Sequence, residues 1–305
     1  MLDLAIMIEG QDGLTWPRWQ RLAEATEELG FAGLYRSDHF TNPDGPRKDA
    51  LELWASLTWL AGNTRRIAFG PLVSPVSFRD PVVTAWMASA VDDLSGGRLR
   101  LGLGAGWQER EHASFGFDLL DVPRRFARFE EGLEVVSHLL SSDEPVSFEG
   151  EYYRLQDALL LPRPGRPGGP PIVIGGNGPR RTLPLVVRYA QEWNATTNPL
   201  PRLRDLNAQL DEMLRGHGRQ PSDVRRTYMT TVLFGRDAAE LERKLEGKTA
   251  AEVRERGTLV GTADEIVAQL QALAEIGING VMARWWDLDD IDGLTAMAEA
   301  VLPHV

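Results

Sequence analysis

The chain of 305 residues contains no cysteine and only five histidines. Without cysteine it can form no disulfide, no thiolate nucleophile and no Cys-ligated zinc or iron–sulfur site. The sequence has no His-x-His pair and no His-Glu-x-x-His pattern, so no metal site is expected and a metal-dependent hydrolase is disfavoured. A Walker A loop, a Gly-x-Ser-x-Gly elbow and a complete dinucleotide fingerprint are also missing.

Positive charge is scarce as well, because 33 Lys and Arg residues face 44 Asp and Glu residues and the net charge is −11. This balance argues against a nucleic-acid partner or a basic membrane-binding surface. No apolar run approaches the roughly 18 residues that a membrane span needs. Residues 1–6 lack the basic segment and the long apolar core of a secretory signal. We therefore expect a cytoplasmic protein that acts on a small molecule.

The sequence does contain an alternation of short apolar runs and helical patterns, repeated about eight times. Such alternation is typical of a parallel sheet with helical crossovers. We expect one α/β domain over residues 1–305, folded as a (β/α)8 TIM barrel with insertions at its C-terminal mouth; an open doubly wound sheet is the alternative. Residues 146–170 are expected to form an insertion with a hairpin, and 237–258 a solvated helix. The expected strands are 4–8, 33–36, 67–72, 99–103, 172–174, 193–196, 228–234 and 280–285.

The most informative stretch follows the fifth expected strand, where the chain reads Gly175-Gly176-Asn177-Gly178 and Pro179 is expected to open a helix. Glycines let a ligand approach the backbone, and proline suits the first helical position. Free N–H groups at a helix start attract anions, typically a phosphate. The alternative is a glycine turn with no ligand.

Catalytic groups of a barrel lie at the carboxyl ends of its strands. Asp38 and His39 follow the second expected strand, and a histidine beside a carboxylate suits proton transfer near neutral pH. The alternative is a histidine that only caps a helix or bonds a carbonyl. Thr196 ends the sixth expected strand, where its hydroxyl would lie near the glycine-rich turn because strands five and six are neighbours.

Gly106 and Trp107 follow the fourth expected strand, where small residues would let a flat ligand lie against the backbone with Trp107 as a wall. Close strand packing beside a core tryptophan is the alternative. Glu109, Glu111 and His112 come next, and a solvent-facing position or a favourable charge at the start of a new helix explains them.

Five runs of the chain together resemble the bacterial luciferase-like monooxygenase superfamily, particularly its branch that uses the deazaflavin coenzyme F420. Their order and spacing match from about residue 4 to residue 197, and the fit is weaker towards the C-terminus. The runs are Ser37-Asp38-His39-Phe40, residues 75–81, Leu94-Ser95-Gly96-Gly97-Arg98, Gly104-Ala105-Gly106-Trp107 and Ile174-Gly175-Gly176-Asn177-Gly178.

This resemblance implies a luciferase-like barrel with a flavin-type cofactor at its mouth. His39 would be the proton donor or acceptor, and a non-prolyl cis peptide behind the ring would fall at Pro71-Leu72. Arg79, Arg180 and Arg181 are expected to form a positive patch for the cofactor tail. The residues expected at the cofactor are Asp38, His39, Pro71, Leu72, Ser74, Gly106, Trp107, Gly175, Gly176, Asn177, Gly178 and Thr196, with Asp38 and His39 catalytic.

The activity implied is hydride transfer between coenzyme F420 and a small organic substrate. An FMN-dependent monooxygenase of the same superfamily and a non-catalytic flavin-binding protein are the alternatives. Sugar-phosphate dehydrogenases of this branch have a catalytic glutamate where this chain has Trp107, which puts that specific activity in doubt. Members of the family are often dimers, so a homodimer is expected.

Overall fold

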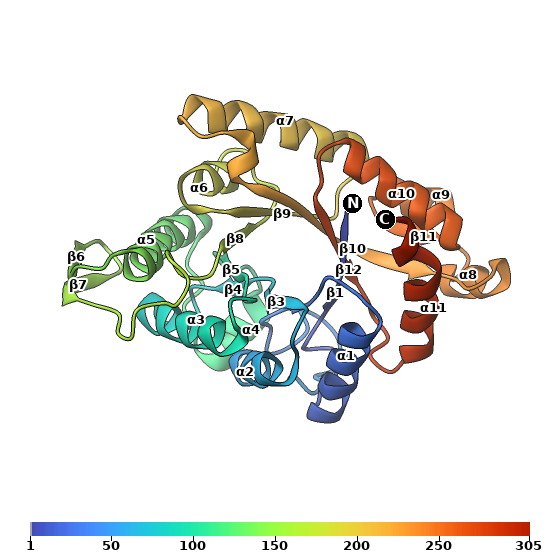
Figure 1. Cartoon of the computed structure of the whole chain (residues 1–305), viewed down its shortest axis with the longest axis horizontal. Helices are drawn as coiled ribbons and strands as arrows, with labels where there is room; N and C mark the ends of the chain where they lie inside the picture. The colour runs from blue at the N-terminus through green and yellow to red at the C-terminus, as the bar shows by residue number, and fades with distance from the viewer. Residues whose placement is uncertain (1) are drawn as a thin grey trace.

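The computed structural model describes residues 2–305, and its centre is a cylinder of strands surrounded by helices (Figure 1). The strands follow the order β3-β2-β1-β12-β10-β9-β8-β5-β4, and every pair along this path is parallel. A bridge joins Phe69 of β3 to Leu99, which lies two residues before β5, so the cylinder is nearly closed. The expected (β/α)8 barrel is therefore confirmed.

Eight strand positions make up the barrel, because the third position is divided into two short strands. Each expected strand coincides with an observed one to within three residues at its start. The barrel strands are β1 (Asp3–Ile8), β2 (Gly33–Arg36), β3 (Ala68–Pro71), β4 (Ser74–Pro75), β5 (Leu101–Gly104), β8 (Ile172–Gly175), β9 (Glu192–Thr196), β10 (Arg225–Phe234) and β12 (Gly280–Arg284).

The third strand divides because it changes partner. The N–H of Leu72 still donates to the carbonyl of Arg36, the last residue of β2, whereas the N–H of Val76 donates to the carbonyl of Gly104 in β5. The peptide bond between Leu72 and Val73 is cis, one bond later than the position expected at Pro71-Leu72. The Val73 side chain fills the gap against β5, where a Cβ on Gly104 would lie 2.6 Å from Val73 Cγ2. Gly104 therefore permits close strand packing at this point.

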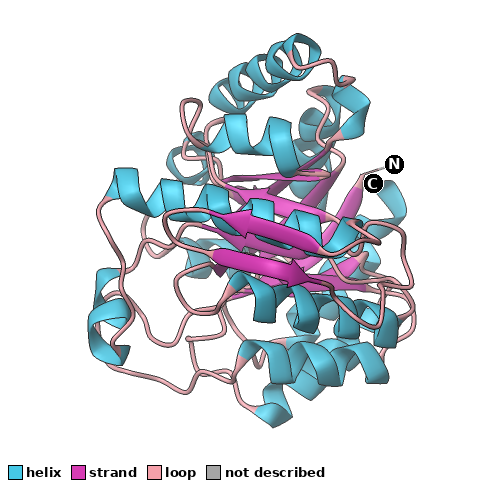
Figure 2. Cartoon of the chain, turned by 90° about the vertical axis from the view of Figure 1, so that its left-hand side faces the viewer, coloured by secondary structure: helices cyan, strands magenta, loops and turns pink. Residues whose placement is uncertain are grey.

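Helices enclose the strands on their outer side (Figure 2). None of those formed by residues 2–305 combines the length and the apolar character needed to cross a bilayer. The helices are α1 (Trp16–Glu28), α2 (Leu53–Asn63), α3 (Pro81–Ser95), α4 (Glu109–Phe115), α5 (Val122–Ser141), α6 (Thr182–Tyr189), α7 (Leu200–Gly216), α8 (Ala238–Leu245), α9 (Ala250–Glu255), α10 (Ala263–Glu275) and α11 (Ile291–Val301), with 3-10 turns at Pro221–Asp223 and Leu302–His304.

Residues at helical spacing form the buried faces of the helices. In α1, Trp19, Leu22 and Thr26 are buried, and in α5 the face that includes Phe129 and Leu133 is buried. Apolar area removed from water contributes about 25 cal/mol per Å², so these faces hold the helices on the barrel.

The hairpin matches the sequence-based expectation, whereas the segment 237–258 and the start of α6 differ from it. The expected hairpin is present as β6 (Val146–Glu149) and β7 (Arg154–Ala158). The expected helix at 237–258 is two helices, α8 and α9, and the short strand β11 (Leu259–Gly261) after them was not expected. Pro179 does not open α6, because the carbonyl of Gly178 accepts from the N–H groups of Thr182 and Leu183 and residues 179–181 form a turn first.

Candidate active site

The carboxyl ends of the barrel strands surround a cavity of about 490 Å³. His39, which follows β2, lines it together with Gly175 and Gly176 at the end of β8 and Thr196 at the end of β9. The carboxyl ends of parallel barrel strands share one rim, so residues far apart in the sequence meet here. The imidazole and the glycine-rich turn therefore face one cavity.

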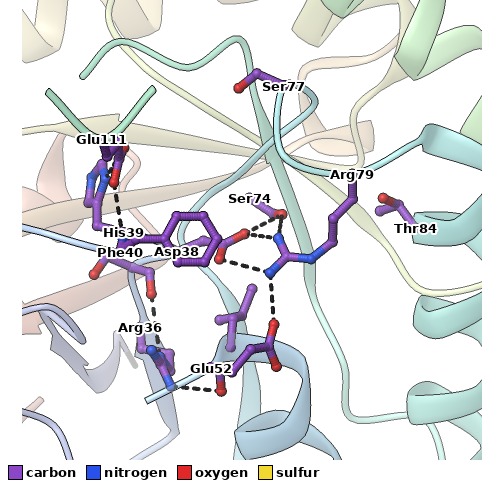
Figure 3. A network of polar contacts seen from close by, with 12 residues as sticks. Arg36, Asp38, His39, Phe40, Glu52, Ser74, Ser77, Arg79, Thr84 and Glu111 are labelled. Carbon is purple, nitrogen blue, oxygen red and sulfur yellow. Dashed lines mark hydrogen bonds and ion pairs between the residues drawn. The ribbon is translucent and has the colours of Figure 1, made fainter. Parts of the chain in front are cut away.

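His39 is held by Glu111 of α4, whose side chain is only 1% exposed. Glu111 Oε1 lies 2.8 Å from His39 Nδ1, and Glu111 Oε2 accepts a 3.0 Å hydrogen bond from the N–H of Phe40 (Figure 3). An ionised carboxylate can only accept, so Nδ1 carries a proton and Nε2 is the basic nitrogen of the neutral ring. Nε2 has no hydrogen-bond partner within residues 2–305.

The surroundings of His39 make it easier to protonate. Burial by itself lowers the pKa of His39, but the hydrogen bond and charge of Glu111, with the charges of Glu9 and Asp38, outweigh it and raise the pKa above its ordinary value. Such an imidazole exchanges protons near neutral pH. His39 can therefore act as a proton donor or a proton acceptor.

Asp38 does not line the cavity and belongs instead to a buried polar cluster (Figure 3). Its carboxylate accepts a 2.7 Å hydrogen bond from Ser74 Oγ and pairs with both terminal nitrogens of Arg79. Arg79 Nη2 also lies 2.8 Å from Glu52 Oε1. The expectation that Arg79 serves the cofactor tail is wrong, because two carboxylates of the protein neutralise it.

Replacing Asp38 by alanine is expected to lower the free energy of unfolding by about 3 kcal/mol, because it leaves the largely buried Arg79 with Glu52 as its one remaining carboxylate partner. Ser74→Ala removes the hydrogen bond to Asp38 and the longer one from Arg79 Nη1, and is expected to cost about 1 kcal/mol. Urea unfolding of both variants measures these losses. Unfolding of Asp38→Ala at the wild-type urea concentration would contradict this structural role.

The glycine-rich turn is fixed to the neighbouring strand by Asn177. Its Nδ2 donates to Thr196 Oγ1 at 2.6 Å, and its Oδ1 accepts from the Thr196 N–H at 2.9 Å. Gly176 has a φ of +125°, which glycine adopts most readily. The N–H groups of Asn177 and Gly178 have no acceptor within residues 2–305. Unpaired amides beside a helix start can hold an anionic group.

Gly106 and Trp107 form another wall of the cavity. Gly106 has a φ of +84°, and a Cβ there would lie 3.0 Å from Ser77 Oγ, so a side chain does not fit. Ser77 Oγ in turn lies 2.8 Å from His112 Nε2. Trp107 is 58% exposed and meets the His39 ring edge-on, with the ring centroids 5.6 Å apart. Trp107 is therefore a cavity wall and not a core residue.

Seven of the residues expected at the cofactor line the cavity and five do not. The lining residues are His39, Leu72, Gly106, Trp107, Gly175, Gly176 and Thr196. Those that do not line it are Asp38, Pro71, Ser74, Asn177 and Gly178. Asn177 is hydrogen-bonded to Thr196, and Ser74 is hydrogen-bonded to Asp38. Asn177 and Ser74 therefore act by positioning these neighbours.

Other lining residues were not expected at the cofactor, among them the charged residues Glu111, Glu9 and Arg284. Glu111 was attributed to a solvent-facing position or to the helix start, although Gln108, Glu111 and His112 recur at helical spacing and predict one buried face. Glu9 follows β1 and Arg284 ends β12. Because the site of a barrel lies at the carboxyl ends of its strands, both residues could have been predicted as site residues from these two strands. No cluster of three or more His, Asp or Glu side chains suited to a metal ion occurs in the part of the chain described.

The chain resembles known proteins over nearly its whole length. A model of the luciferase-like monooxygenase family matches residues 7–251. The F420-dependent glucose-6-phosphate dehydrogenase of Amycolatopsis mediterranei (strain U-32) is 28% identical over 317 residues, covering 93% of this chain and 92% of that protein.

Solved structures show the same fold. An F420-dependent secondary alcohol dehydrogenase in complex with an F420-acetone adduct aligns with a TM-score of 0.84 at 19% identity, over 100% of this chain and 99% of that one. The oxygenating constituent of 3,6-diketocamphane monooxygenase from Pseudomonas putida, in complex with FMN, aligns with a TM-score of 0.78 at 17% identity, over 100% and 99% of the two chains.

Proposed function

Since this chain belongs to the luciferase-like monooxygenase family, we propose that it is an oxidoreductase that transfers a hydride between coenzyme F420 and a small organic substrate. The observation that carries the proposal is that His39 and the glycine-rich turn line one cavity at the carboxyl ends of the strands. The F420 dependence of a relative that matches most of the chain supports the choice of cofactor.

The residues of the cavity, together with the rest of the glycine-rich turn beside it, fit a flavin-type cofactor with a negatively charged tail. Leu72 and Val73 give an apolar wall for a flat ring. The unpaired amides of Asn177 and Gly178 suit a phosphate, and the exposed side chains of Arg180 and Arg181 follow in the same turn. Asn177 and Gly178 enter the proposal through these backbone groups, and Thr196 through its hydroxyl.

His39 moves the proton in this proposal. When bound, the deazaflavin supplies the site that accepts or gives the hydride. In the direction of alcohol oxidation, the C–H bond of the carbinol carbon breaks with its electron pair, a C=O bond forms, and the hydroxyl proton passes to His39 Nε2. Glu111 keeps the other proton on Nδ1 and stabilises the imidazolium that results. Asp38 contributes through its charge and through the shape of the loop after β2.

Titration of the purified protein with F420 and, separately, with FMN tests the cofactor. We expect F420 to bind at least about tenfold more tightly, a difference of about 1.4 kcal/mol. The double variant Arg180→Glu, Arg181→Glu should weaken F420 binding about tenfold, because two charges near a phosphate are reversed.

The matched control reverses Arg65 and Arg215, which precede β3 and end α7 and so lie at the other rim of the barrel. This control should bind F420 as the wild type does. Tight binding of FMN without binding of F420 would replace the proposal with the FMN-dependent monooxygenase, and binding of neither would reject both.

A further inference from the structure

A charged pair at the cavity does not itself carry the proton in the transfer proposed above. Arg284, the last residue of β12, places Nη1 3.1 Å from Oε1 of Glu9, which directly follows β1. Thr231 Oγ1 accepts from Arg284 Nε at 3.1 Å and from Nη2 at 2.7 Å. Trp286 covers the guanidinium, 4.6 Å from its ring centroid. Both charged side chains line the cavity, with 23% of Arg284 and 11% of Glu9 exposed.

The barrel order places this pair across the cavity from the glycine-rich turn. β1 and β12 are neighbours, whereas β8 lies four positions from β1, counted through β2, the divided third strand and β5. Four positions in a ring of eight is the opposite side. A cofactor tail on the turn after β8 therefore leaves Glu9 and Arg284 on the side open to substrate, beside His39 after β2.

This side of the cavity has no uncompensated positive charge among the residues described. Glu9 neutralises Arg284. Arg125, the other arginine of the lining, keeps its charge, but it comes from α5, which follows β5 in the chain, and β5 is the neighbour of β8; it therefore belongs to the side of the glycine-rich turn, where it donates to the carbonyl oxygens of Gly106, Leu119 and Leu120. We propose that this end of the cavity takes an uncharged alcohol or carbonyl compound, and that Glu9 makes it reject substrates bearing phosphate or carboxylate by neutralising Arg284.

The pair still provides hydrogen-bonding groups for an uncharged molecule. A guanidinium has five N–H donors, and Thr231 and Glu9 use three of those of Arg284. The remaining donors can bind a hydroxyl or carbonyl oxygen, and Glu9 can accept from a hydroxyl. A phosphate would gain one neutralised arginine and meet the negative charges of Glu9 and Glu111. Met7 and Met229 add apolar lining, which suits a substrate with carbon surface.

This inference rests on the proposed function for the position of the cofactor, and it sets the chain apart from its glucose-6-phosphate dehydrogenase relative. The test compares cyclohexanone with glucose 6-phosphate by intrinsic tryptophan fluorescence, on protein loaded with whichever of F420 and FMN binds. If F420 does not bind, the proposed cofactor is rejected, but the binding of cyclohexanone and of glucose 6-phosphate can still be compared.

We expect saturable binding of cyclohexanone and none of glucose 6-phosphate to the wild type. Glu9→Gln frees the charge of Arg284 and should raise the affinity for glucose 6-phosphate at least tenfold relative to the affinity for cyclohexanone. Glu109→Gln removes the same charge from an exposed position of α4 and should behave as the wild type.

Two results with glucose 6-phosphate would overturn the inference. One is saturable binding of glucose 6-phosphate to the wild type in competition with cyclohexanone, which needs no variant to be folded. The other is binding of glucose 6-phosphate to a folded Glu9→Gln protein that is no tighter than to the wild type. Failure of cyclohexanone, cyclohexanol and 2-butanone alike to bind the wild type would count against it equally.

Discussion

Substitution of His39 by alanine is expected to lower kcat by about 100- to 10,000-fold, the usual contribution of a positioned acid or base. The imidazole is the proton-exchanging side chain of the proposal, and its Nε2 has no protein partner within residues 2–305. Cofactor affinity should change by less than about threefold, because the proposed anion contacts lie after β8. Steady-state turnover and cofactor titration of the same preparation measure the two effects separately.

The matched control for this variant is His138→Ala, which removes an imidazole from an exposed position of α5. It should leave both turnover and cofactor affinity unchanged. A His39→Ala protein that binds cofactor and turns over at the wild-type rate would show that the proton is carried elsewhere. If the cofactor binds but neither the His39→Ala nor the His138→Ala protein turns over any substrate, the result favours a non-catalytic flavin-binding protein.

Substitution of Glu111 by glutamine is expected to lower kcat about 100-fold or more, although Glu111 is separated from the substrate by the imidazole. The N–H of Phe40 must donate, so it will take the single amide oxygen of the glutamine. The amide NH2 is then left facing His39 Nδ1 and stabilises the tautomer protonated at Nε2. That tautomer cannot accept a proton from substrate, so Glu111 is a positioning residue.

The same substitution should shift the pH profile to lower pH. Glu111 raises the pKa of His39 against the opposing effect of burial, so its loss lets burial lower that pKa. In alcohol oxidation the neutral imidazole is the active form, and the rise of kcat/KM with pH would move to lower pH. In carbonyl reduction the protonated form is active, and the fall of kcat/KM with pH would move in the same direction.

Glu111→Asp keeps a carboxylate and should recover part of kcat and a pH profile nearer to that of the wild type. A purely structural role predicts otherwise, because the shorter side chain disturbs packing more than glutamine does. An unshifted pH profile in a folded Glu111→Gln protein would contradict the assignment. Circular dichroism establishes the fold of each variant.

The fold and the main parts of the site followed from local patterns. Residues of a strand or helix repeat with the period of that element, so the strand positions and the buried faces of α1 and α5 were readable in the sequence. Because barrel strands end at one rim, the residues after each strand identified His39 and the glycine-rich turn as occupants of one cavity.

The partners of the charged side chains did not follow from those patterns. Arg79 was expected beside the cofactor tail and is paired with Asp38 and Glu52, 41 and 27 residues away. Glu111 was attributed to solvent or to the helix start and lies against His39, 72 residues away. The sequence shows that a charged side chain needs a polar or oppositely charged partner. Which partner lies close enough depends on how the loops after different strands are arranged in space.

The amino-acid sequence alone determined a barrel of eight strand positions, a histidine after the second strand position and the glycine-rich turn after the fifth. Each of these features depends on residues that are close together in the chain. The tertiary structure decided that the third strand changes partner at Val73, that Glu111 fixes the tautomer of His39, and that Glu9 neutralises Arg284. These depend on distances between separate loops, which become fixed only when the barrel closes.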